Sequence, residues 1–199
     1  MVDVADKRSI KREHKATIEL LRRINACDTT DELLQRAADF FTELSGCAQT
    51  EIRLREGCHS PCIESYTESS RNENSILTPG EDEATVSGRD KTSLIVFISG
   101  IILSGRSDPA KPFFTEHGSF WTNSFSELLT NSDFAEQLGI LPDILDCEGY
   151  ESIAVIPLRR EGETLGFMHF IDRLKGRFTP GLIAMLERIG DHLAIALSQ

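Results

Sequence analysis

The sequence predicts an α+β domain with a central antiparallel sheet that carries helices on one face. Two apolar runs, at residues 152–158 and 165–171, flank a short polar turn, which is the pattern of a β-hairpin. An amphipathic helix follows this hairpin, and a second helix with a capping pattern begins near residue 30. Strands and helices therefore occupy separate stretches of one chain, as in an α+β domain.

Size and charge limit the classes of function. The chain has 199 residues, of which 40% are hydrophobic and 27% charged, enough for one cored domain without disulfides or a structural metal. A net charge of −11 repels polyphosphate, so we expect no nucleic-acid partner. No run reaches the roughly 18 apolar residues of a membrane helix, and the N-terminus lacks the apolar core of a signal peptide. We expect a cytoplasmic protein without a membrane span.

Residues 1–27 are predicted to form an N-terminal helix that precedes a domain at residues 28–199. Ile10, Thr17, Leu21 and Ile24 recur at heptad spacing, and charged side chains fill the positions between them. We interpret this segment as a signalling and dimerisation helix. A solvated lead-in helix fits the same pattern.

The first half of the domain begins with clear local signals. Thr29 and Glu32 form a capping-box pattern at the start of a helix, and Gly46 supplies the left-handed residue that ends it. Residues 51–55 alternate apolar and charged side chains, as a half-buried strand does. Residues 66–92 are polar and acidic, which predicts a long insertion or lid.

The middle of the chain is less regular. The apolar residues 94–98 predict a buried strand, which continues at 101–103 after a break at Ser99 and Gly100. Residues 106–130 combine turn formers with aromatic side chains, and a short helix is expected at 123–129. A further helical patch falls within 131–149. Thr179 is the expected N-cap of the last helix, with Pro180 at its first position.

The closing residues, 152–172 and 178–197, resemble the final hairpin and helix of the GAF domain family, a group of ligand-sensing modules of signalling proteins. The resemblance extends over about residues 28–198. It implies a GAF-like, PAS-related α+β fold in which a ligand pocket lies on the sheet face opposite the helices. Residues 106–123 and 147–152 are similar to a subgroup attached to microbial sensor histidine kinases.

The same resemblance places the ligand cleft beside the aromatic middle segment. We predict that the ligand-binding residues are Arg53, Ser99, Phe120, Trp121, Asn123 and Tyr150. The aromatic side chains allow two interpretations: they pack the irregular segment against the sheet, or they line the cleft. The aromatic cluster comprises Phe113, Phe114, Phe120, Trp121 and Phe125.

Cysteines and histidines offer an alternative chemistry. Cys58, Cys62 and Cys147 are candidate redox residues. Some relatives in the kinase-linked subgroup are connected with haem or redox sensing through cysteines, but residues 96–104 here contain none. Zinc needs four ligands, and no second cysteine pair completes a site, so we expect no metal. The cofactor stays unknown.

Three of the histidines are candidate functional groups. His117 is the best-placed imidazole for a ligand or haem, next to Gly118 and the aromatic segment. His169 lies among apolar residues of the second hairpin strand and fits a hydrogen-bonded core residue better than a ligand. His192 fits the surface or a dimer interface.

No catalytic motif is present, and we predict no catalytic residues. Three functions remain: a small-molecule sensor of signal transduction, a redox or haem sensor, and an enzyme like the GAF lineage that reduces free methionine sulfoxide. The resemblance favours the first. It implies a small-molecule ligand, a homodimer paired through the terminal helices, and an output domain such as a histidine kinase in a two-component system.

Overall fold

The computed structural model describes residues 4–55, 92–131, 134, 136–137, 145–146 and 149–198. The helices are α1 (Val4–Ile24), α2 (Thr30–Ser45), α3 (Leu94–Leu103), α4 (Phe125–Thr130) and α6 (Pro180–Ala196). The strands are β1 (Gln49–Leu54), β2 (Thr92–Ser93), β3 (Phe120–Thr122), β4 (Leu145–Asp146), β5 (Ser152–Arg160) and β6 (Glu163–Asp172). Nearly all of the predicted insertion at 66–92 and most of the predicted helical patch at 131–149 lie outside the described residues.

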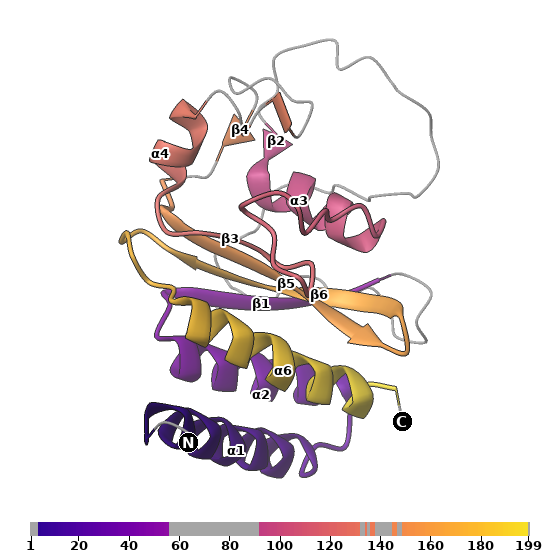
Figure 1. Cartoon of the computed structure of the whole chain (residues 1–199). Coiled ribbons are helices and arrows are strands. Elements are labelled where there is room, and N and C mark those ends of the chain that lie inside the picture. The colour runs from indigo at the N-terminus through magenta and orange to yellow at the C-terminus, as the bar shows by residue number, and fades with distance from the viewer. Residues whose placement is uncertain are drawn as a thin grey trace.

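A four-stranded antiparallel sheet with the order β1-β6-β5-β3 forms the centre of the domain (Figure 1). The hairpin of β5 and β6 supplies its two central strands, which confirms the hairpin predicted from the sequence. Arg160 pairs with Glu163, and the two residues between them, Glu161 and Gly162, have positive φ values of 51° and 89°. Two such residues form the type I′ turn, whose twist matches that of the paired strands.

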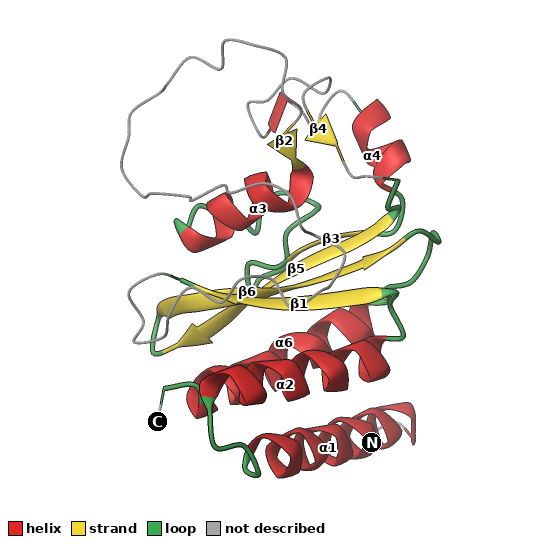
Figure 2. Ribbon diagram, turned by 180° about the vertical axis from the view of Figure 1, so that it is seen from behind, coloured by secondary structure: helices red, strands yellow, loops and turns green. Residues whose placement is uncertain are grey.

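Helices α2 and α6 cover one face of the sheet, and α1 forms an outer layer beyond them (Figure 2). Both inner helices have the predicted caps. Thr29 Oγ1 accepts a hydrogen bond from the Glu32 amide at 3.2 Å, and Thr179 Oγ1 accepts one from the Leu182 amide at the same distance. Gly46 ends α2 in the left-handed conformation, with φ of 68°.

Helix α1 packs onto the domain through one narrow apolar stripe. Ala16, Leu20 and Ile24 are buried, one turn apart, in the core beneath α2 and α6. Ile10 and Ile18, in contrast, are 63% and 46% exposed. The division into residues 1–27 and 28–199 stays a prediction, as does the dimerisation role of this helix. None of the helices in the described part of the chain is long and apolar enough to cross a membrane.

The other face of the sheet lies beneath α3, α4 and the segment that leads to β3 (Figure 1). Here the predicted strands at 94–98 and 101–103 are wrong, because these residues form the single helix α3. Ile98, Ser99 and Ile102 are buried, and Ile95 is half-buried. These four residues follow the i, i+3, i+4, i+7 spacing of one helix face. A short apolar run fits a buried strand equally well, since periodicity alone does not separate the two.

The end of α3 also has a helical signature. The amide of Arg106 donates to the Ile101 carbonyl at 3.0 Å, and the amide of Gly105 donates to Ile102 at 3.1 Å. Gly105 has a φ of 69°, which completes a Schellman motif. This glycine therefore closes a helix. The short helix expected at 123–129 is present as α4.

Candidate functional site

A small polar cluster lies on the sheet face beneath α3, where β1 pairs with β6. Glu51 and Arg53 of β1 stand opposite His169 and Phe167 of β6. His169 Nε2 lies 3.4 Å from Glu51 Oε2, and the same oxygen lies 3.2 Å from Arg53 Nε and 3.1 Å from Arg53 Nη2. Glu51 and His169 are only 5% and 3% exposed, while Arg53 reaches solvent. A carboxylate thus joins a buried imidazole to a guanidinium at the edge of the sheet.

Burial controls the protonation of His169. Removal from water lowers the pKa of this imidazole to about 4, with Glu51 opposing the shift and Arg53 adding to it. The ring is therefore neutral at pH 7. Because Nε2 faces a carboxylate, the proton belongs on Nε2 and the lone pair on Nδ1. Nδ1 is buried and has no hydrogen-bond partner within the described ranges.

The lowered pKa of His169 predicts a pH-dependent stability. The unfolded chain takes up a proton near pH 6.5, whereas the folded protein resists it until about pH 4. The contribution of His169 is therefore complete above pH 6.5 and decreases as the pH falls toward 4. The loss is on the order of 3 kcal/mol. Urea unfolding of His169→Phe should show a correspondingly flatter decline over this range.

The exposed His192 provides the matched control for this experiment. His192→Phe makes the same chemical change on the surface of α6 and should keep the pH profile of the unaltered protein. An identical profile for His169→Phe would contradict the buried neutral imidazole.

The aromatic side chains on this face are packed against one another. Phe113, Phe114, Phe120 and Phe125 are buried in one cluster with Phe134. The ring centroids of Phe113 and Phe134 lie 5.0 Å apart in an edge-on arrangement, and those of Phe113 and Phe114 lie 5.2 Å apart. This is the packing that the first of the two interpretations expects.

The structure brings four of the six predicted ligand residues to this face. Phe120 is in the cluster, and Tyr150 packs against it with the Arg173 guanidinium 5.4 Å from its ring centroid. Ser99 is buried on α3, where its hydroxyl donates to the Ile95 carbonyl at 2.6 Å. Arg53 belongs to the polar cluster described above.

The other two predicted ligand residues lie elsewhere. Trp121 follows Phe120 along β3, so its side chain packs against the core on the helical face. Asn123 bonds the backbone of Phe178 twice, as donor to its carbonyl and as acceptor from its amide, both at 2.8 Å. This pair anchors the start of α6 to the end of β3. A ligand role for the six residues stays a prediction.

Sequence reasoning missed the polar cluster itself. His169 was interpreted as a core residue and Glu51 was not singled out. The alternation of residues 51–55 does place Glu51 and Arg53 on one face of the strand. The contact of Glu51 with His169 depends on the register between β1 and β6. No local pattern in either strand predicts that register.

One segment touches both faces of the sheet. Phe113 and Phe114 pack on the face beneath α3. The next residue, Thr115, and then His117 contact α6 on the opposite face. Thr115 Oγ1 donates to Glu187 Oε1 at 2.5 Å, and His117 Nε2 lies 3.4 Å from Asp191 Oδ1. Burial raises the pKa of Asp191, and His117 opposes this shift. The segment therefore connects the two faces physically around the edge strand β3.

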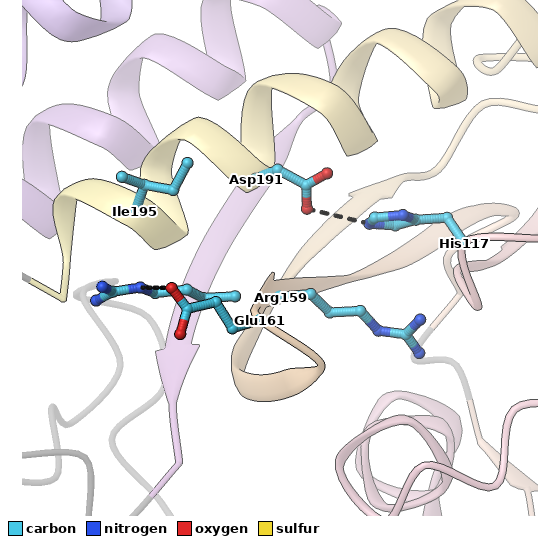
Figure 3. Close-up of a pocket in the computed structure, with 6 residues that line it drawn as sticks. His117, Arg159, Glu161, Asp191 and Ile195 are labelled. Atoms are coloured by element: carbon cyan, nitrogen blue, oxygen red, sulfur yellow. Dashed lines mark ion pairs between the residues drawn. The ribbon is translucent and has the colours of Figure 1, made fainter.

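A hollow of about 520 Å³ adjoins this segment (Figure 3). It lies where the hairpin turn meets the second half of α6. His117 and Asp191 point toward each other across it in Figure 3. The hollow is open to solvent and separate from the Glu51–His169 cluster. Its lining residues are His117, Arg159, Arg160, Glu161, Asp191 and Ile195.

The redox candidates Cys58, Cys62 and Cys147 lie outside the described residues. Cys27 and Cys47 are free thiols, and burial raises the pKa of each. In the portion of the chain that the structure describes, no three His, Cys, Asp or Glu side chains are grouped as a metal site would require.

The structure is thus an α+β domain with an antiparallel sheet, helices on one face and a polar cluster on the other. A family model described as the GAF domain matches residues 27–198. The chain therefore belongs to the GAF domain family, whose members are sensory and regulatory domains. None of the curated proteins matches the chain.

Three solved structures are similar to this chain, and the two with TM-scores above 0.5 support the likeness in fold. The GAF domain of a phosphoenolpyruvate-protein phosphotransferase from Coxiella burnetii is 15% identical, with 92% of this chain and 90% of that chain covered and a TM-score of 0.55. A protein solved in its far-red absorbing dark state with bound biliverdin IXα is 13% identical in sequence. The match covers 92% of this chain and 98% of that chain, with a TM-score of 0.52. A domain assigned to a two-component sensor histidine kinase from Sinorhizobium meliloti 1021 is 14% identical, with coverage of 87% and 94% and a TM-score of 0.46.

Proposed function

We propose that this domain senses a small molecule on the sheet face beneath α3, in the cytoplasm, and that it has no catalytic activity of its own. The observation that carries this proposal is His169, a buried neutral imidazole whose Nδ1 lone pair has no partner among the described residues. An unused buried acceptor costs free energy unless a ligand or water donates to it. Its position beside the apolar cluster of this face supports a ligand with an apolar body.

The ligand chemistry follows from the groups in the cluster. Nδ1 of His169 accepts a hydrogen bond, so the ligand should carry an N–H or O–H donor. Arg53 reaches solvent at the rim, where it can pair with an anionic group of the ligand. Biliverdin IXα in a protein of the same fold supports the idea that this fold can hold a small molecule. The identity of that ligand does not transfer at 13% identity.

Transmission would use the segment 113–117. A ligand that displaces the aromatic cluster would move Phe113 and Phe114, and with them the contacts of Thr115 to Glu187 and of His117 to Asp191. Helix α6 would then have one arrangement with these contacts and one without them. The ligand shifts the population between the two only if it binds one arrangement more tightly. We propose that the terminal helices pair in a homodimer and pass this change to an output domain such as a histidine kinase.

Native mass spectrometry of the purified protein tests the sensing site. We expect a co-purifying small molecule and a lower occupancy in His169→Phe, because the loss of one hydrogen bond to a buried group, about 1.4 kcal/mol, weakens the affinity about tenfold. His192→Phe is the matched control and should keep full occupancy. A bound molecule whose occupancy is the same in His169→Phe would place the ligand elsewhere.

Hydrogen exchange measured with and without that molecule tests the transmission. Protection of the α6 amides should change on binding in the unaltered protein. In Thr115→Val, which removes the hydroxyl that donates to Glu187, the change at α6 should be smaller while occupancy stays the same. Equal responses in both proteins would exclude this route.

A further inference from the structure

The hollow at the end of the hairpin presents charges of both signs from different elements. Asp191 extends from α6, and its side chain is 40% exposed. Its Oδ1 is buried and lies 3.4 Å from His117 Nε2. Arg159 approaches from the end of β5, on the His117 side of the hollow (Figure 3). The positive charge of Arg159 opposes the rise in the pKa of Asp191 that burial causes.

Arg159 is a cation whose side chain has no partner among the described residues. The residue is half-buried, and its guanidinium forms no hydrogen bond or ion pair with any residue in the described ranges. The neighbouring Arg160, by comparison, donates to the Ser198 carbonyl at 3.1 Å and lies 3.8 Å from Glu161. A guanidinium with free donors can bind a carboxylate through two parallel hydrogen bonds. Among small metabolites without phosphate, the carboxylate is therefore the group that it binds best.

An apolar surface completes the hollow. Ile195, one turn after Asp191 on α6, is 48% exposed and lies on the opposite side from His117 (Figure 3). A volume of about 520 Å³ is within the roughly 300–1,000 Å³ of small-molecule sites. The lining therefore offers a carboxylate, a guanidinium and an aliphatic side chain around a space the size of a metabolite.

We propose that this hollow binds a small zwitterion of the α-amino acid class. The ligand's carboxylate pairs with Arg159, its ammonium with Asp191, and its aliphatic side chain lies on Ile195. A ligand with only one charge would pair with either Arg159 or Asp191 and would meet a like charge at the other residue. The site is separate from the His169 cluster, but it includes the His117–Asp191 contact through which the proposed signal would pass. An amino acid bound here would act on that contact directly.

Titration followed by two-dimensional NMR tests this site on the whole chain. L-leucine is the first probe, with 4-methylpentanoate and 3-methylbutylamine as analogues that lack the ammonium or the carboxylate. The other proteinogenic amino acids follow. We expect saturable shifts for at least one amino acid at or below about 10 mM, with each single-charge analogue weaker by about tenfold or more. Saturation by none of them, or equal binding of the analogues, would overturn the proposal.

Variants locate the binding. Arg159→Gln and Asp191→Asn should each weaken the affinity about tenfold, the effect of losing one charge-assisted contact. Arg36→Gln removes an exposed cation of α2 that does not line the hollow, and it should leave the affinity unchanged. His169→Phe should also leave the affinity for the amino acid unchanged. The experiment therefore distinguishes a failure of this amino-acid site from a failure of the proposed sensing site at His169. Undiminished binding in both Arg159→Gln and Asp191→Asn would exclude the hollow.

Discussion

Replacing Gly166 with alanine should lower the free energy of unfolding by about 3 kcal/mol or more, the largest effect that we expect from a single substitution. A Cβ at this position would overlap the carbonyl oxygen of Arg53 and would lie 2.8 Å from Leu54 Cα. Both atoms belong to the backbone of β1, which the pairing with β6 holds in place. No side-chain rotation can relieve such a clash. Urea unfolding followed by circular dichroism measures the loss.

Gly100 provides the comparison. It lies within α3, and a Cβ there would meet nothing within 4 Å. Gly100→Ala should therefore be neutral or should gain about 0.5–1 kcal/mol from the helix preference of alanine. If Gly166→Ala were as stable as the unaltered protein, the close approach of β1 to β6 would be incorrect, and with it the contact between Glu51 and His169.

The second large effect is expected at Asp172, which joins three parts of the chain. Its side chain is almost fully buried, at 2% exposure. Oδ1 accepts from the Leu174 amide at 2.8 Å, and Oδ2 accepts from the Ala48 amide at 3.1 Å and from Arg177 Nε at 2.7 Å. Asp172→Asn keeps the shape but turns one acceptor into a donor that faces other donors. We expect a loss of about 2–4 kcal/mol.

An exposed carboxylate gives the matched control for Asp172. Asp39 on α2 is exposed and accepts one hydrogen bond from Gln35. Asp39→Asn should change the free energy of unfolding by no more than about 0.5 kcal/mol. Similar small effects at both positions, measured by the same unfolding experiment, would show that Asp172 does not organise the junction of β1, β6 and the loop before α6.

The predictable parts of this fold are those with strong local signals. Thr29 and Thr179 begin helices because a threonine hydroxyl can satisfy an amide that the first turn leaves unpaired. The hairpin followed from two apolar runs around a turn that contains Gly162. In each case the deciding contacts lie within a few residues along the chain, so the sequence contains them directly.

The helix α3 shows where local signals fail. Its residues are apolar on every side, so they have no polar face to reveal a period of 3.6. Burial between the sheet and the surrounding chain decides in favour of the helix, and Ile98 and Ile102 then face the cluster. The preference of β-branched residues for strands is too weak to oppose that packing.

The sequence by itself determined the family, the two capped helices beneath the sheet, the central hairpin, and the acidic character of the chain. Only the tertiary structure decided that His169 and Glu51 meet, that Phe120 and Trp121 serve opposite faces, and that Arg159 and Asp191 share one hollow. The physical reason is the range of the contacts. Caps and turns depend on neighbours in the chain, whereas these pairs depend on strand register and on packing between elements distant in sequence.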